Sequence, residues 1–135
     1  MIIPLQDGID EAKKSHSIYK HSCILFTPTT VLAKGYNSTM YHAEAVAAKR
    51  LKNNRGCYAL VISVGKSGKL RSSKPCKHCT EILRNIKVKG IYYSDRDGNL
   101  NFVRPNKLTD TKISSGHNIR YKKESYNRDK ILKTN

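Results

Sequence analysis

The stretch PCKHC at residues 75–79 and the stretch HAE at residues 42–44 are the two motifs around which this chain is organised. Because the proline of the first motif suits the first position of a helix, Cys76 and Cys79 are expected one turn apart, on one side of that helix. Partial positive charge at the helix N-terminus favours thiolate over thiol. Two thiolates and the imidazole of His42 make three protein ligands for zinc. Such a set leaves a fourth position open for water, as in catalytic zinc sites.

Glu44 follows His42 by two positions and does not share its helix face, so we expect it to handle protons beside the metal. The alternative is an ordinary first-turn glutamate that complements the helix dipole. For the group as a whole, the alternative is a structural zinc site. That site would need a fourth ligand, for which His78, Cys57 and His21 are candidates, and it would not need the glutamate.

The length of 135 residues favours one domain, which we place at residues 1–105, followed by a basic, partly flexible extension at 106–135. The longest apolar run, Tyr58–Val64, is far too short to span a bilayer, and no apolar leader opens the chain. We therefore expect neither a membrane segment nor a signal peptide. Cys23 and Cys57 each begin an apolar run and are expected as buried thiols, which favours a reducing, cytoplasmic location.

Positive charge is concentrated in two blocks, residues 66–89 and 104–135, and the formal net charge of the chain is +16. Such concentration favours a polyanionic partner, here nucleic acid bound without sequence preference. The alternative is plain surface charge, because a Lys-, Asn-, Ile- and Tyr-rich composition can also reflect an AT-rich genome.

Hydrophobic periodicity predicts three helices, at Asp7–His21, Tyr41–Lys52 and Cys76–Asn85. The first of them would carry His16, half-buried, on its apolar face. Short β-type runs predict five strands, at Ser22–Phe26, Thr30–Lys34, Cys57–Val64, Gly90–Ser94 and Leu100–Arg104.

Turn signals at residues 27–29 and 95–99 make the first two strands and the last two antiparallel hairpins, while residues 65–74 read as a basic loop. The central strand is apolar on both faces, as in a strand covered by helices on each side. These elements predict an α/β fold, a mixed five-stranded sheet with helices on both faces.

The H-x-E and P-C-x-x-C motifs at this spacing resemble those of the cytidine/deoxycytidylate deaminase superfamily, and the element order agrees from about Ile9 to Arg104. The resemblance implies a cytidine deaminase-like fold in which His42, Cys76 and Cys79 bind zinc and Glu44 shuttles protons. The chain as a whole also resembles deaminase-like proteins of large DNA viruses, partly through SSGH at residues 114–117. A viral source would imply virion association.

The same resemblance gives two indications of the substrate class. Histidine at position 42 is typical of deoxycytidylate, tRNA-adenosine and polynucleotide cytosine deaminases, since nucleoside deaminases usually carry cysteine there. The predicted strand Leu100–Arg104, however, resembles the antiparallel last strand of the nucleoside class. The two features indicate different substrates, and the oligomeric state stays open, although related enzymes assemble.

We therefore predict a zinc-dependent hydrolytic deaminase of cytidine, deoxycytidine or its monophosphate. Asn37 is similar to a family asparagine that contacts substrate, and Arg71 or Lys74 would meet a phosphate. Backbone N–H groups near Pro75 would orient the amine, and Ala43 completes the expected substrate contacts. The alternatives are a nucleic-acid-binding or assembly protein on a deaminase-like fold, and a deaminase that edits polynucleotides.

Overall fold

The computed structural model describes residues 1–53 and 56–107. The basic extension expected at 106–135 thus lies almost entirely outside the described residues. The elements in chain order are α1 (Leu5–Ala12), β1 (Lys20–Phe26), β2 (Val31–Tyr36), α2 (Ala43–Arg50), β3 (Tyr58–Val64), β4 (Leu70–Arg71), α3 (Lys77–Asn85), β5 (Ile91–Ser94), β6 (Leu100–Val103) and a 3₁₀ turn (Pro105–Lys107).

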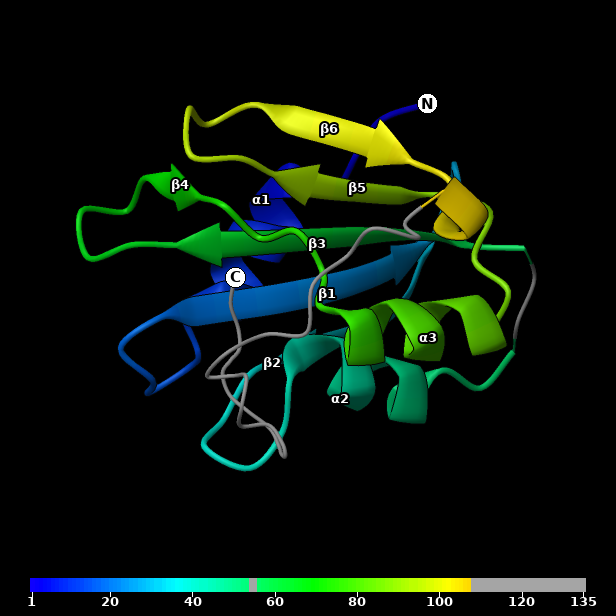
Figure 1. Cartoon of the computed structure of the whole chain (residues 1–135), viewed down its shortest axis with the longest axis horizontal. Coiled ribbons are helices and arrows are strands. Elements are labelled where there is room, and N and C mark those ends of the chain that lie inside the picture. Colours follow the sequence, from blue (N-terminus) through cyan, green and yellow to red (C-terminus); the bar gives the residue numbers. More distant parts are fainter. Residues whose placement is uncertain (54–55, 108–135) are drawn as a thin grey trace.

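The strands form one mixed sheet in the order β2-β1-β3-β5-β6, with β4 paired to β3 beyond the end of β5 (Figure 1). Strands β1 and β2 pair antiparallel, as do β5 and β6, which confirms both predicted hairpins. Strands β3 and β5 run parallel, and α3 lies in the connection between them. This is the mixed α/β fold that the sequence predicts.

The sheet has six strands and not five, because residues 65–74 are not wholly a loop. Leu70 and Arg71 pair with Val64 and Ser63, so the chain turns back along β3 before it reaches α3. A strand of two residues has no periodicity to detect, and it forms only because β3 extends past its parallel partner.

Helices cover both faces of the sheet, as predicted. On one face, α1 packs its Ala12 against a cluster that includes Ile24 and Leu60. On the other face, α2 and α3 cover a second cluster through Ala47 and Leu83 (Figure 1). Strand β3 lies between the two layers, and all its residues after the first are buried.

The backbone of helix α2 packs directly against strand β2, and this contact fixes the position of the start of the helix. A Cβ atom placed on Gly35 of β2 would lie 2.6 Å from the Ala47 nitrogen and 2.7 Å from the Ala43 oxygen. Only glycine allows this approach, because side-chain rearrangement cannot relieve a clash with backbone atoms. The first residue of α2 is thereby held close to β2.

The first helix is shorter than the sequence predicts: it ends at Ala12 and not near His21. The hydroxyl of Ser15 donates to the Asn37 carbonyl and accepts from the Ser17 amide, an alternative to helical pairing. Strand β1 then begins at Lys20. His16 lies outside the helix and is exposed, so the predicted half-buried packing is wrong.

Neither the length nor the apolar character needed to cross a membrane is found in any helix within residues 1–53 and 56–107.

Candidate active site

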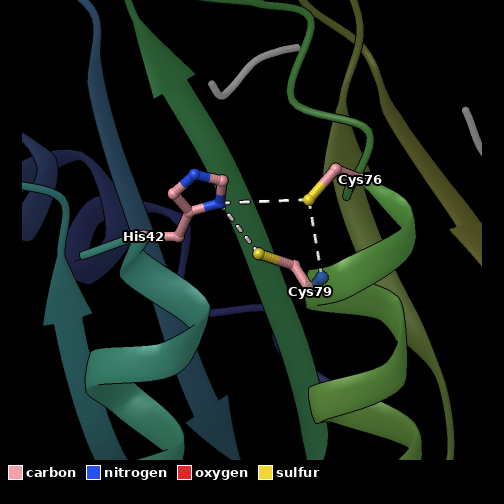
Figure 2. A group of neighbouring side chains, drawn as sticks. All are labelled: His42, Cys76 and Cys79. Carbon is pink, nitrogen blue, oxygen red and sulfur yellow. Dashed lines mark hydrogen bonds between the residues drawn. The ribbon is translucent and has the colours of Figure 1, made fainter. Parts of the chain in front are cut away.

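The three expected metal ligands come from the N-termini of two neighbouring helices (Figure 2). His42 is the N-cap residue of α2, and its extended backbone (φ −76°, ψ 153°) turns its side chain toward α3. Cys76 is the N-cap residue of α3, with φ −70° and ψ 170°, and Cys79 lies in the first turn of the same helix. Packing of α2 beside α3 on one face of the sheet brings these residues together.

The ligand atoms lie close enough together to hold a single metal ion. His42 Nδ1 is 3.1 Å from Cys79 Sγ and 3.9 Å from Cys76 Sγ, and all three atoms lie within 4.8 Å of one another. Tetrahedral zinc with ordinary bond lengths places neighbouring S and N ligands about 3.5–3.8 Å apart. Two thiol groups and one imidazole are ligands that zinc prefers, so donor chemistry and spacing both fit a zinc cofactor.

No fourth His, Cys, Asp or Glu joins this group in the part of the chain that the structure describes. His78 is exposed on α3, Cys57 is buried in the core beneath α2 and α3, and His21 lies on β1. A structural zinc site would draw its fourth ligand from one of these three. The described group keeps three protein ligands, the number found at catalytic zinc.

Burial affects the charge of the Cys79 thiol. Desolvation raises the pKa of Cys79 well above its ordinary value, and the neighbouring Cys76 and Glu44 raise it further. In the metal-free chain this desolvation opposes the ionised form that the partial positive charge of the helix N-terminus favours. A bound cation is needed to hold the thiolate form.

Glu44 is buried in the first turn of α2, with 6% of its surface exposed. It interacts with Cys79 by a hydrogen bond and by charge, and its charge also raises the pKa of Cys23 below it. A carboxyl group is thus held against the metal ligands from the side of the core. Its burial is more than an ordinary first-turn glutamate needs, because such a residue complements the helix dipole from the surface.

Asn37 joins the two loops that precede β1 and α2. Its Oδ1 accepts from the His21 amide at 2.8 Å, and its Nδ2 donates to the Tyr19 carbonyl at 2.9 Å. An amide group has four hydrogen-bonding positions, so one donor and one acceptor position remain for another partner.

Of the other expected substrate contacts, Ala43, Lys74 and Pro75 lie at or directly before the same helix N-termini. Ala43 is the first residue of α2 and is buried, as is Pro75, which immediately precedes Cys76. Lys74 is exposed beside them. Arg71, the last residue of β4, is also exposed, and its guanidinium lies 4.4 Å from the centre of the Tyr19 ring.

Sequence reasoning missed Tyr19, Ser73 and Ser94. Tyr19 contacts Arg71, and the two serines form a buried hydrogen-bond network next to the metal motif. No sequence signal distinguishes them, because serine and tyrosine next to a strand or loop are ordinary residues there. Their contacts depend on how β4 pairs with β3 and lies next to the end of β5.

The comparisons with known structures show the fold. Cytidine deaminase from Burkholderia pseudomallei superposes with a TM-score of 0.59 at 17% identity, over 81% of this chain and 99% of that one. Cytidine deaminase from Mycobacterium tuberculosis gives 0.54 at 14% identity, over 82% and 98%. RibD from Acinetobacter baumannii gives 0.51 at 19% identity, over 67% of this chain but only 27% of that protein.

No curated protein sequence matches the chain. The low structural identities support a cytidine deaminase-like fold and nothing finer. The family model of the cytidine and deoxycytidylate deaminase zinc-binding region, however, matches residues 6–95, which span both helices of the metal site. On this match, this chain belongs to the cytidine and deoxycytidylate deaminase zinc-binding family.

Proposed function

We propose that this chain is a zinc-dependent hydrolytic deaminase of a cytosine nucleoside or nucleotide, of the cytidine or dCMP type. One observation carries the proposal: two helix N-termini bring His42, Cys76 and Cys79 together, with the buried Glu44 against them. Three ligands leave a coordination position for water, and a carboxyl group beside it can move protons. Membership of a deaminase family supports catalytic activity.

In this mechanism, His42, Cys76 and Cys79 hold the metal and Glu44 moves the protons. Zinc, when bound, lowers the pKa of water toward neutrality and so supplies hydroxide. Glu44 accepts the proton that the attacking water gives up and passes it to the ring nitrogen beside the reacting carbon. Glu44 then takes the second proton from the hydroxyl group that has added to the ring carbon and delivers it to the amine, so the bond to nitrogen breaks, ammonia leaves and the hydroxyl oxygen becomes the carbonyl.

Backbone groups at the two helix N-termini would orient the base. The first N–H groups of a helix have no intrahelical partner, so the amide of Ala43 can donate to a substrate acceptor. The carbonyl of Pro75 has the opposite character and can accept from the exocyclic amine. Burial of both residues would keep bulk water away from these contacts.

Exposed cations near the site favour a nucleotide over a free nucleoside. Arg71 and Lys74 flank the loop that enters α3, where a 5′-phosphate could meet them. The cation–π contact with Tyr19, whose ring centre lies 4.4 Å from the guanidinium carbon, would orient the Arg71 side chain. Asn37 would use its remaining donor or acceptor on the sugar.

The decisive experiment measures ammonia release by zinc-loaded protein from three substrates: dCMP, cytidine and a cytosine-containing single-stranded oligonucleotide. We expect turnover of dCMP, a smaller rate on cytidine, and no turnover in Glu44→Gln. Turnover of the oligonucleotide alone would assign the chain to polynucleotide editing. Absence of turnover on all three by a zinc-loaded, folded protein would overturn the proposal.

A second candidate is nucleic-acid binding on the same fold, and the distribution of charge favours it. Lys66, Lys69 and Lys74 are exposed in the segment between β3 and α3, and the net charge is +16. Phosphate contacts by such cations need no catalytic centre. This binding would therefore persist in a variant without deaminase activity.

A further inference from the structure

The sheet forks next to the metal motif. Strands β3 and β5 pair in parallel only as far as Val61 and Tyr93. Beyond that point β4 replaces β5 as the neighbour of β3, and Figure 1 shows β4 beside β3 past the end of β5. At the fork, backbone groups lose their regular partners and must find others, because buried N–H and C=O groups are almost always paired.

Ser73 occupies this fork with its side chain. The residue is 3% exposed, and its Oγ lies 2.7 Å from the Val61 carbonyl of β3. The same oxygen accepts from the Ser94 amide of β5 at 2.9 Å, while the Ser73 amide donates to the Ser94 carbonyl at 2.9 Å. Ser73 thus hydrogen-bonds to both β3 and β5 at the point where these two strands stop pairing with each other.

Ser94 completes the network from the other side. It is fully buried, and its Oγ lies 2.7 Å from Ser73 Oγ and donates to the Arg71 carbonyl at 2.5 Å. It also accepts from the Ser63 amide at 3.3 Å. Each hydroxyl has a single proton, so the two protons are shared among three contacts: to the Val61 carbonyl, to the Arg71 carbonyl and between the serines. Removal of either serine would therefore break several hydrogen bonds of the network.

The network is directly connected to a metal ligand. Only Lys74 and Pro75 separate Ser73 from Cys76, and the proline ring fixes one of the few dihedral angles in that short segment. On the helix side, the amide and the hydroxyl of Thr80 both donate hydrogen bonds to the Cys76 carbonyl, at 2.8 Å and 2.9 Å. Cys76 is therefore anchored at both ends, by its helix and by the serine fork.

We propose that Ser73 and Ser94 act as a positioning pair for the metal site: through the fork they set where Cys76 Sγ lies relative to His42 Nδ1. The proposal rests on the metal centre of the proposed function but not on its substrate. Neither serine belongs to the group of candidate ligands, so both would act through Cys76. Residues that hold metal ligands in place typically change metal affinity 10- to 100-fold when they are lost.

The test is zinc affinity by competition with a chromophoric chelator, without any substrate. Ser73→Ala should raise the zinc dissociation constant about 10- to 100-fold. Ser72→Ala is the matched control, since that neighbouring serine is exposed and should bind zinc like the parent protein. Ser94→Ala should weaken zinc to a similar degree, and the double variant little further, because both substitutions break one network.

Cobalt substitution separates positioning from plain loss of stability. At saturating Co²⁺, folded Ser73→Ala should show altered thiolate-to-cobalt and d–d absorption bands, whereas Ser72→Ala should not. Parental zinc affinity and parental bands in Ser73→Ala, or in Ser94→Ala if the first variant does not fold, would overturn the proposal. A parent protein that binds zinc but deaminates nothing would overturn the proposed function and leave this inference standing, and a parent that binds no zinc would overturn both.

Discussion

Nδ1 of His42 lies 3.1 Å from Sγ of Cys79, although the two residues are 37 positions apart in the chain. The contact exists because Gly35 lets the start of α2 approach β2 while α3 packs beside α2 on the same face. Burial raises the pKa of Cys79 and so favours the protonated thiol in the metal-free chain. Such an arrangement is suited to exchange its thiol protons for a cation.

The first prediction concerns metal content. Wild-type protein should hold one zinc per chain, and Cys76→Ala should lose most of it, because two remaining ligands bind zinc weakly. Metal analysis after gel filtration measures this. Cys57→Ala is the control, since Cys57 is equally a buried thiol but lies outside the metal group, and it should keep its zinc. Loss of zinc from the control alone would contradict the assignment.

A second prediction is that zinc affinity rises with pH. Burial raises the pKa of Cys79, so the metal-free thiol is protonated at neutral pH and zinc must displace that proton. Affinity should therefore rise by up to about tenfold per pH unit for each proton released, and fall as the pH is lowered. Chelator competition at several pH values between mild acid and mild alkali measures the slope. An affinity independent of pH would mean that the thiolates exist before the metal binds.

The third prediction isolates proton transfer. Glu44→Gln keeps the size of the side chain but cannot carry a proton, so deamination should fall at least about 10²- to 10⁴-fold while zinc is retained. Glu81→Gln is the matched control, because Glu81 is an exposed glutamate on α3. Both variants are compared by initial rates of ammonia release and by zinc content. Undiminished turnover in Glu44→Gln would remove this residue from the mechanism.

A fourth prediction concerns the hairpin β5–β6. The carboxylate of Asp95 accepts from the Asn101 side chain and from the amides of Asn99 and Asp97, and these hydrogen bonds lower its pKa. A lowered folded-state pKa contributes stability above the unfolded pKa of about 3.9, and that contribution is lost as the pH falls through the folded value.

Urea unfolding measures the effect. Asp95→Asn should be less stable than the parent protein at pH 7, and the difference should shrink as the pH falls below about 4. Asp97→Asn is the control in the same turn, where the side chain is exposed, and it should change stability little. An Asp95→Asn deficit that is equally large in acid would mean that the charge of the carboxylate plays no part.

The sequence predicts those parts of the fold that local patterns encode. The turn at residues 95–99 and the runs beside it are enough to predict a hairpin, and the spacing of two motifs predicts that His42 and Cys79 meet. Strand β4 and the Ser73–Ser94 fork escape prediction because they depend on how β3 pairs. The early end of α1 escapes prediction because it depends on the contact of Ser15 with the distant Asn37. Tertiary partners, and not propensity, decide such elements.

The last prediction tests nucleic-acid binding. If the exposed cations between β3 and α3 contact phosphates, affinity for a single-stranded oligonucleotide should fall linearly with salt on logarithmic axes. Replacing Lys66, Lys69 and Lys74 with alanine should lower that slope by at most three contacts, each worth about 0.7–0.9. A control triple at Lys34, Lys49 and Lys52, also exposed but on β2 and at the end of α2, removes the same net charge. Fluorescence anisotropy measures both.

The control decides between a binding surface and net charge alone. If the segment between β3 and α3 forms the surface, only the first triple variant loses slope, and Glu44→Gln binds like the parent protein because phosphates and not bases are contacted. Equal losses in both triples would mean that diffuse charge attracts the oligonucleotide. No binding at low salt would assign the basic excess to composition and leave a small-molecule deaminase as the function that the site supports. Binding that depends on cytosine content and on Glu44 would instead point to chemistry on the polynucleotide.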